Sequence, residues 1–237
     1  MTTDGRPVLL VGASGLAREV LPLLAVEGRT VLGVLDDRYA DLPPVLPPPY
    51  DHVPVLGPVS SAPDHPDAAL LLCVGPSSVR TALRDRLGPS AEFATVVDWS
   101  VRNPAACGIG AGSILMAHVA ITADAVLGEH VVALPGVTVT HDCVVGDVAT
   151  LAAGVALGGG VVVGPGAYLG MNASVHPGVR VGAGATVGMG AVVLHDVPDG
   201  ETWAGVPARR LVPRPARVAN PRDTTATQPF RTPQEAR

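Results

Sequence analysis

The chain reads IGAGSILMAHVAITADAVLGEHVVALPGVTVTHDCVV over residues 109–145, with an aliphatic side chain at every sixth position. This period continues without a break to Val193. A second column of small residues, four positions after each anchor, runs from Ser113 to Ala191. Each six-residue unit therefore has two positions that face inward. The anchors are Ile109, Leu115, Ile121, Leu127, Ala133, Val139, Val145, Leu151, Leu157, Val163, Leu169, Val175, Val181, Val187 and Val193.

Glycine follows every third anchor, which adds a repeat of eighteen residues, at positions 110, 128, 146, 164 and 182. Three short strands per eighteen-residue coil predict a parallel β-helix of triangular cross-section. Successive coils would pair like parallel strands about 4.8 Å apart, with the anchors stacked into one core. We expect about five coils, with glycine supplying unusual backbone angles at the corners.

The composition agrees with a narrow prism, because 47% of the 237 residues are apolar but only 3% are aromatic. A net charge of −5 without a dense basic tract argues against nucleic acid as a partner. Residues 1–20 lack the pattern of a signal peptide, and no apolar stretch predicts a membrane span. We therefore expect a cytoplasmic protein.

The first hundred residues lack this period and alternate strand and helix patterns, so we divide the chain near residue 100. A proline-rich segment at 43–58 is predicted to be a loop. The expected elements lie at residues 8–11 (strand), 16–27 (helix), 31–36 (strand), 69–74 (strand), 77–87 (helix) and 93–97 (strand).

A glycine turn at residues 12–15 joins the first strand to the first helix. Free amides and the helix dipole at such a turn can hold a phosphate or diphosphate. Asp36 and Asp37 end the next strand, where a carboxylate often meets a ribose hydroxyl. A tight packing turn and two solvated acids explain the same residues, so spacing alone leaves both readings open.

The spacing of the cysteines and histidines opposes a disulfide and a metal site. Cys107 and Cys143 stand two coils apart in the inward column, about 10 Å between Cα atoms and beyond the disulfide limit. Cys73 falls in an apolar strand pattern. A γ-carbonic anhydrase shares this β-helix and binds zinc through three histidines, but the close histidine pair that its site needs is missing here.

His141 is the candidate general base, because it follows anchor Val139 by two positions and precedes Asp142. This position points away from the core at a corner of the prism. Imidazole titrates near neutrality, and an adjacent carboxylate favours its charged form. A solvated surface histidine explains the same pattern. His118 and His130 also fall at corners, and we expect them to be solvated.

The chain carries VGASGLAREV at 11–20, LDD at 35–37, THDCVVGD at 140–147 and WAGVPAR at 203–209. Together and in this order, these segments resemble the NeuD/PglD family of hexapeptide-repeat sugar acetyltransferases. The resemblance covers roughly residues 6–212. It implies an N-terminal α/β Rossmann-like domain, a left-handed parallel β-helix, a homotrimer, and acetyl-CoA as the acyl donor.

The resemblance also implies direct attack of a sugar amine or hydroxyl on the thioester, with His141 as base and Asp142 orienting its ring. The Gly159 amide would stabilise the oxyanion, or Gly159 is only a corner glycine. Residues that would lie near CoA, in a groove between neighbouring prisms, are Gly170, Met171, Asn172, Gly205, Pro207 and Arg209. Residues that would hold the nucleotide-sugar are Gly12, Ser14, Gly15, Asp36 and Asp37.

On this reading the domains are 1–100 for nucleotide-sugar binding, 101–196 for the acyltransferase β-helix, 197–212 for a CoA-proximal segment and 213–237 for a disordered tail. Two positions depart from bacillosamine-type members. Leu16 begins the stretch where those members have a histidine and a basic residue, and Thr150 replaces a second histidine near the acetyl group. The first departure removes a substrate contact, and the second bears on acetyl-CoA contacts and rate, but not on the base.

We favour N-acetylation of a nucleotide-linked amino sugar. O-acetylation of sialic acid or a related sugar is the first alternative. A non-catalytic nucleotide-sugar-binding subunit, which would lack CoA binding, and a β-helix metalloenzyme are the others.

Overall fold

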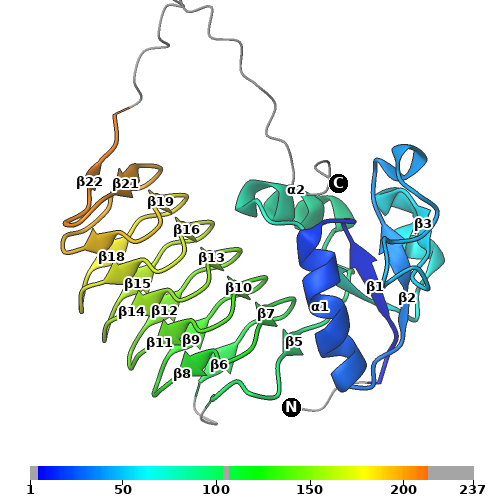
Figure 1. Cartoon of the computed structure of the whole chain (residues 1–237), viewed down its shortest axis with the longest axis horizontal. Coiled ribbons are helices and arrows are strands. Elements are labelled where there is room, and N and C mark those ends of the chain that lie inside the picture. Colours follow the sequence, from blue (N-terminus) through cyan, green and yellow to red (C-terminus); the bar gives the residue numbers. More distant parts are fainter. Residues whose placement is uncertain (1–4, 104–106, 213–237) are drawn as a thin grey trace, which may run out of the picture.

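The computed structural model describes residues 5–103 and 107–212, in which an α/β part lies beside a three-sided β-helix (Figure 1). The tail predicted at 213–237 lies outside the described residues. Within the described ranges, no helix is long and apolar enough to cross a membrane.

The N-terminal sheet has four parallel strands in the order β3-β2-β1-β4. The predicted helices and first two strands are confirmed to within one residue, and β3 falls inside the predicted proline-rich loop. Being three residues long and at the sheet edge, β3 tolerates its flanking prolines. The elements are β1 (Val8–Val11), α1 (Gly15–Val26), β2 (Val31–Leu35), η1 (Tyr39–Asp41), β3 (Val55–Gly57), η2 (Val59–Asp64), β4 (Ala69–Leu72) and α2 (Ser77–Leu87).

The β-helix has three parallel faces, and between β5 and β20 the paired strands lie eighteen residues apart along the chain, whereas β19 pairs with β21 at an offset of sixteen. Face 1 consists of β5 (Val96–Val97), β7 (Ile114–Leu115), β10 (Val132–Ala133), β13 (Thr150–Leu151), β16 (Tyr168–Leu169), β19 (Thr186–Val187), β21 (Thr202–Ala204) and the antiparallel β22 (Arg209–Arg210). Face 2 consists of β8 (Ala120–Ile121), β11 (Thr138–Val139), β14 (Ala156–Leu157), β17 (Ser174–Val175) and β20 (Val192–Val193). Face 3 consists of β6 (Gly108–Ile109), β9 (Val126–Leu127), β12 (Val144–Val145), β15 (Val162–Val163) and β18 (Arg180–Val181).

The interior of the prism is the predicted pair of columns. The anchors from Leu115 to Val193 are buried and Ile109 is half-buried, and the small residues between them are buried as well. Cys107 and Cys143 are buried free thiols in this core, as predicted. Burial of each larger aliphatic contributes about 1.5–3 kcal/mol, so the stack of coils is the main source of stability in this part.

The α/β part packs on face 1. Outward-facing Ile114 and Val132, together with Met116, share one buried cluster with α1 and the N-terminal sheet. We predicted a strand at 93–97 within the α/β part, but β5 pairs with β7 of the β-helix instead. Only an isolated bridge joins Phe93 to Leu70 of β4. The short apolar run satisfied the strand pattern without revealing which sheet it joins.

His130 corrects a second expectation, because it is 2% exposed rather than solvated. Its ring packs edge-on against Phe93, 4.4 Å between centroids, and its buried Nδ1 has no partner among the described residues. Burial, and then the positive charges of Arg84 and Arg80, lower the pKa of His130 to about 4. The corner position was read correctly, but the sequence does not show that the α/β part covers this corner.

The free energy of unfolding is expected to fall as the pH drops from about 6.5 to 4, because the unfolded chain binds a proton at His130 that the folded chain excludes. Above about pH 6.5 His130 is neutral in both the folded and the unfolded chain, so its effect on the free energy of unfolding no longer changes with pH. Chemical denaturation at several pH values should give a loss of up to about 1.4 kcal/mol per pH unit relative to His130→Gln. The matched variant His118→Gln, at an exposed corner, should keep the wild-type slope; equal slopes for all three proteins would contradict the prediction.

Candidate functional site

We call the turns between faces 2 and 3 the histidine corner, which includes residues 140–143, 158–161 and 176–179. At this corner the His141 Nδ1 lies 2.7 Å from the Asp142 Oδ2. Both side chains are about two-thirds exposed, at 66% and 65%. Asp142 has φ 60°, a left-handed conformation that aspartate tolerates. With Nδ1 bound to Asp142, the His141 Nε2 is the ring nitrogen left to exchange a proton.

Gly159 stands one coil further along, directly beneath the imidazole ring. A Cβ atom at this position would lie 2.4 Å from both the Nε2 and the Cε1 of His141. The next residue fixes the contact, because the Gly160 amide donates to the His141 carbonyl at 2.9 Å. Among the described residues, no backbone carbonyl accepts a hydrogen bond from the Gly159 amide. The ring of His141, rather than an unusual backbone angle, is therefore what requires glycine here.

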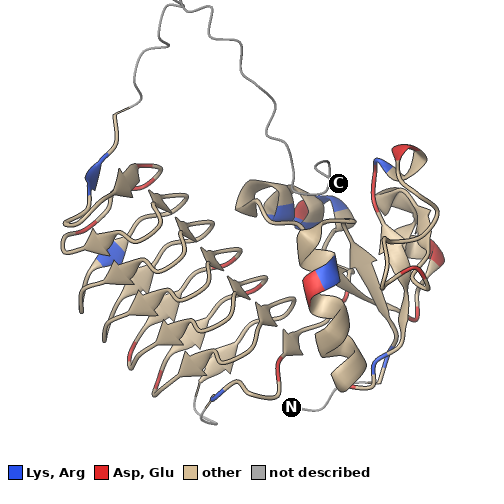
Figure 2. Cartoon of the chain, in the orientation of Figure 1, with Lys and Arg blue, Asp and Glu red and all other residues tan. Residues whose placement is uncertain are grey.

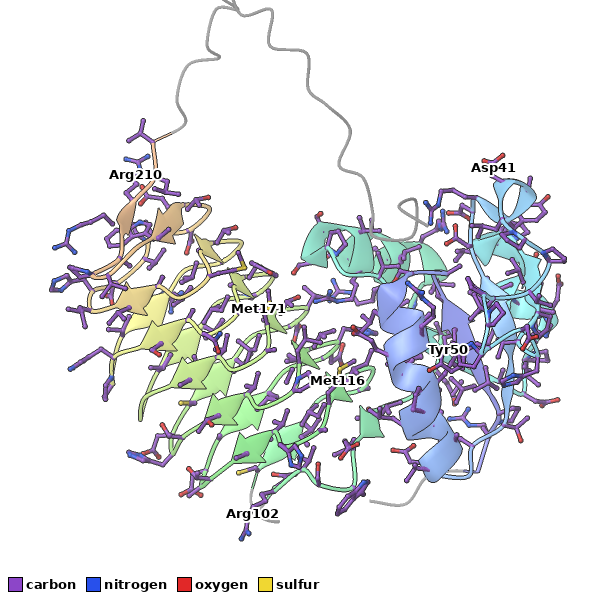
Figure 3. All side chains as sticks on the ribbon, viewed as in Figure 1. Asp41, Tyr50, Arg102, Met116, Met171 and Arg210 are labelled. Carbon is purple, nitrogen blue, oxygen red and sulfur yellow. The ribbon has the colours of Figure 1, made fainter. Side chains whose placement is uncertain are left out.

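The residues predicted to lie near CoA gather elsewhere, at the methionine corner, which we define as residues 116–119, 134–137, 152–155, 170–173 and 188–191 between faces 1 and 2. Met116 is buried against the α/β part, whereas Met171 is 47% exposed further along this corner (Figure 3). Gly170 contacts the backbone of Met189, and the Val192 amide donates to the carbonyl of Gly205. The structure thus brings Gly170, Met171, Asn172 and the segment 205–209 together, but face 2 separates them from His141.

Arg209 lies at the end of the prism, where strand β22 forms a small basic site (Figure 2). Its guanidinium donates to the carbonyl of Ala208 at 2.8 Å, and the side chain is otherwise exposed. Neighbouring Arg210 pairs with Glu201 at 3.0 Å. Arg209 is therefore the arginine of the pair whose charge is available to an anion.

The glycine turn lies at the carboxyl ends of β1 and β4, where the order of strands in the sheet reverses. Open parallel sheets bind ligands at such a switch point. Gly12 has φ +105°, and a Cβ atom there would lie 2.4 Å from the Val74 Cγ2. The Ser14 hydroxyl caps α1 by accepting from the Leu16 amide and donates to the Cys73 carbonyl at 2.6 Å. A cavity of about 200 Å³ lies beside this turn and includes Gly15 in its lining.

Asp36 and Asp37 bind protein groups on this edge. Asp36 accepts from the amides of Ala13 and Arg38, both at 2.9 Å. Burial acts to raise the pKa of Asp36, but these amides and the Arg38 guanidinium lower it below its usual value. Asp37 accepts from the Val59 amide and from Arg86 at 2.8 Å. The two carboxylates thus shape the turn.

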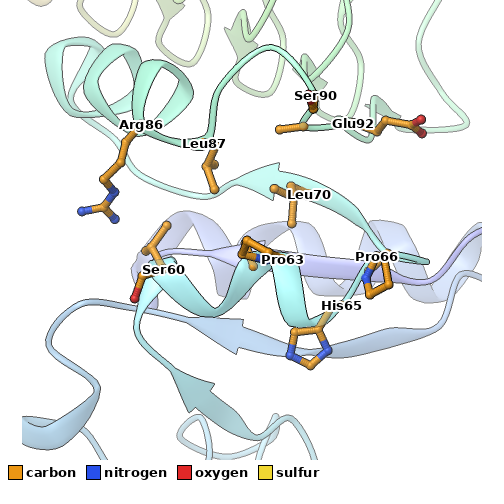
Figure 4. A pocket seen from close by; sticks show the side chains of 13 residues that line it. Ser60, Pro63, His65, Pro66, Leu70, Arg86, Leu87, Ser90 and Glu92 are labelled. Atoms are coloured by element: carbon orange, nitrogen blue, oxygen red, sulfur yellow. The ribbon is translucent and has the colours of Figure 1, made fainter.

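A larger cavity of about 520 Å³ lies between η2 and α2, and its walls are mainly apolar (Figure 4). None of the predicted site residues lines it. Arg86 borders it, with its charge already paired to Asp37. The cavity lacks a nucleophile beside a base, so we assign it no chemistry.

Arg80 is a residue that the sequence reading missed. It is 1% exposed and joins α2 to the β-helix, where one of its acceptors is the Thr150 hydroxyl at 2.8 Å. The Thr150 side chain is therefore hydrogen-bonded to the α/β part. A signal was present, because Arg80 precedes Leu83 by three residues and Leu87 by seven, on the apolar side of the helix. Across the described ranges, no group of three or more His, Cys, Asp or Glu side chains is placed to hold a metal ion.

A family model described as bacterial transferase hexapeptide (six repeats) matches residues 160–195. No curated protein matches the chain. Solved structures do. A histidine-to-asparagine variant of perosamine N-acetyltransferase from Caulobacter crescentus, in complex with CoA and GDP-perosamine, is 32% identical with a TM-score of 0.80, covering 87% of this chain and 97% of that one.

Two further structures are similar over nearly the same length. The acetyltransferase domain of PglB from Neisseria gonorrhoeae FA1090 is 28% identical with a TM-score of 0.79, covering 87% of this chain and 100% of that chain. WeeI from Acinetobacter baumannii AYE is 30% identical with a TM-score of 0.74, covering 86% and 99%. The likeness thus extends over both parts of the molecule.

Gly159→Ala is expected to displace the His141 ring, because the new methyl group would occupy its position. The unfolding free energy should change by less than about 1 kcal/mol, since the exposed ring can swing into solvent. Crystallography and denaturation would measure both. Gly108→Ala, where a Cβ atom meets nothing closer than 3.9 Å, is the control. An unmoved ring in the Gly159→Ala crystal would refute this contact argument.

Proposed function

The chain belongs to the hexapeptide-repeat sugar acetyltransferases, and from this membership we propose that it transfers the acetyl group of acetyl-CoA to the amino group of a nucleotide-linked amino sugar. The observation that carries the proposal is the His141–Asp142 pair, held over Gly159 with the imidazole Nε2 left open. The similarity to a perosamine N-acetyltransferase bound to CoA and GDP-perosamine supports this class of donor and acceptor.

His141 is the proposed general base. Its Nε2 removes a proton from the acceptor nitrogen as that nitrogen attacks the thioester carbonyl. The carbon–nitrogen bond forms, the carbon–sulfur bond breaks, and the departing thiolate takes a proton. Asp142 holds Nδ1 in the protonated tautomer and balances the charge of the imidazolium. The Gly159 amide, which has no carbonyl partner among the described residues, donates to the developing oxyanion.

The acceptor is proposed to bind at the switch point of the N-terminal sheet, which we take to be Rossmann-like, beside a β-helix that we take to be left-handed. The N-termini of α1 and α2 both lie at this switch point, and a helix N-terminus favours the binding of phosphate. Gly12, Ser14 and Gly15 would approach the diphosphate. Asp36 and Asp37 hold the loops at this edge through hydrogen bonds to backbone amides. Their remaining lone pairs can accept hydrogen bonds from ribose hydroxyls.

A homotrimer is proposed because one chain does not bring its acceptor and base sites together. The α/β part packs on face 1, whereas His141 stands at the corner opposite that face. On face 3, Val126 and Val144 are 50% and 45% exposed in adjacent coils, as expected of a surface covered by another copy. The methionine corner of one chain and the histidine corner of the next would form the CoA groove, with Arg209 near the phosphates.

His141→Ala is expected to lower the turnover number about 10²- to 10⁴-fold, because the acceptor loses its general base. The assay is thiol release from acetyl-CoA with a panel of nucleotide-linked amino sugars and free sialic acids. The control is His65→Ala, which changes a histidine that lines the cavity between η2 and α2, to which we assign no chemistry. Comparable losses in both variants, or no thiol release by the wild-type protein with any acceptor, would overturn the proposal.

Mixed trimers should separate action within one chain from action between chains. His141→Ala and Asp36→Ala are each expected to be nearly inactive. Coexpression should restore about a quarter of wild-type activity, because one ordered pair of neighbours in four carries both intact halves. The same variants mixed after separate assembly are the control. Coexpressed trimers that stay inactive would show that each site is built from a single chain.

A further inference from the structure

Arg80 is an almost fully buried arginine that has no carboxylate partner among the described residues. Its exposed fraction is 1%, and its guanidinium donates to four carbonyl oxygens and the Thr150 hydroxyl. These carbonyls belong to Val74, Gly75, Val148 and Ala149, at 3.0, 2.5, 2.7 and 3.3 Å. A buried charge is costly unless it is well hydrogen-bonded, so the folded chain must keep these acceptors in place around the guanidinium.

The acceptors of Arg80 belong to two different parts of the molecule. Val74 and Gly75 form the turn between β4 and α2, one side of the proposed acceptor site. Val148, Ala149 and Thr150 belong to the β-helix at the corner between faces 3 and 1. Arg80 is thus a three-way connection between α2, the turn and the β-helix.

The β-helix side of this connection is held under strain. Val148 has φ 52°, a left-handed conformation that is unfavourable for a β-branched residue. Its amide donates to the Glu129 carbonyl, and its own carbonyl accepts from Arg80 at 2.7 Å. Strain of this kind, of the order of 1–3 kcal/mol, persists only where surrounding contacts fix it.

The other side of the connection reaches the glycine turn. Val74 packs directly against Gly12, leaving no room there for a Cβ atom. The preceding residue, Cys73, accepts from the Ser14 hydroxyl at 2.6 Å. Loss of Arg80 would therefore affect the proposed diphosphate-binding turn through a single intervening residue, Val74.

We propose that Arg80 is a positioning residue that fixes the β4–α2 turn, and with it the bound acceptor, against the β-helix at Val148–Thr150. This inference rests on the proposed function and assigns Arg80 no contact with the reacting atoms. It predicts that loss of Arg80 weakens acceptor use selectively, because the CoA-proximal residues and His141 lie at other corners.

The test compares Arg80→Met and Thr150→Val with the control Arg84→Met, which changes an arginine one turn further along α2 whose partner is Asp85. The KM for the acceptor, the KM for acetyl-CoA and kcat are measured for each variant. Calorimetry with GDP and UDP measures nucleotide affinity without turnover. Thr150→Val removes one acceptor of Arg80 and the 3.4 Å contact with the Ser77 hydroxyl, so it keeps the test available if Arg80→Met fails to fold.

Arg80→Met should raise the acceptor KM and the nucleoside diphosphate Kd about tenfold or more, the equivalent of one or two hydrogen bonds. Thr150→Val should move both in the same direction by about threefold. The KM for acetyl-CoA should stay within about twofold of wild type, and Arg84→Met should match wild type throughout. Equal losses toward acceptor and acetyl-CoA, or unchanged acceptor and nucleotide constants, would overturn the assignment. If wild-type protein transfers no acetyl group, the proposed function fails separately, and nucleotide affinity alone then decides the role of Arg80.

Discussion

The pairing of residues eighteen positions apart is the constraint on which the rest of the molecule depends. From β5 to β20 the strands of the prism bond to the next coil in this register, so the corners become columns of residues at fixed spacing. One such column places His141 directly over Gly159, and another brings Met171 near the segment 205–209. A rigid stack of this kind holds a base in place without a deep pocket, which explains why the candidate base is largely exposed in one chain.

Coverage of face 1 by the α/β part determines how the proposed site must be assembled. The glycine turn and the β4–α2 turn, which form the proposed acceptor site, are held beside face 1 by a shared apolar cluster and by Arg80. His141 of the same chain stands at the corner opposite that face. The proposed trimer would resolve this separation, since each chain would then offer its turn to one neighbour and its histidine corner to the other.

Sequence periodicity predicted the β-helix almost completely, because its two inward columns depend on local repeats alone. The two α-helices and the strands β1, β2 and β4 were also predicted, whereas η1, η2 and β3 were not; β3 has only three residues between prolines. Contacts between the two parts were not predictable, and this is why His130 was expected to be solvated, β5 was given to the wrong sheet and Arg80 was overlooked. The structure places His141 beside Asp142 and over Gly159, and the catalytic roles of these residues stay predictions.

A crystal structure of the assembled protein with CoA and a nucleotide-linked amino sugar tests the central claim most directly. The account predicts that the acceptor nitrogen lies about 2.6–3.2 Å from the Nε2 of His141, with the sugar nucleotide held at the glycine turn of a neighbouring chain. The Nδ1 of that histidine should remain on Asp142. An acceptor amine bound at any other corner, or beside His141 of the same chain that holds its nucleotide, would contradict the account.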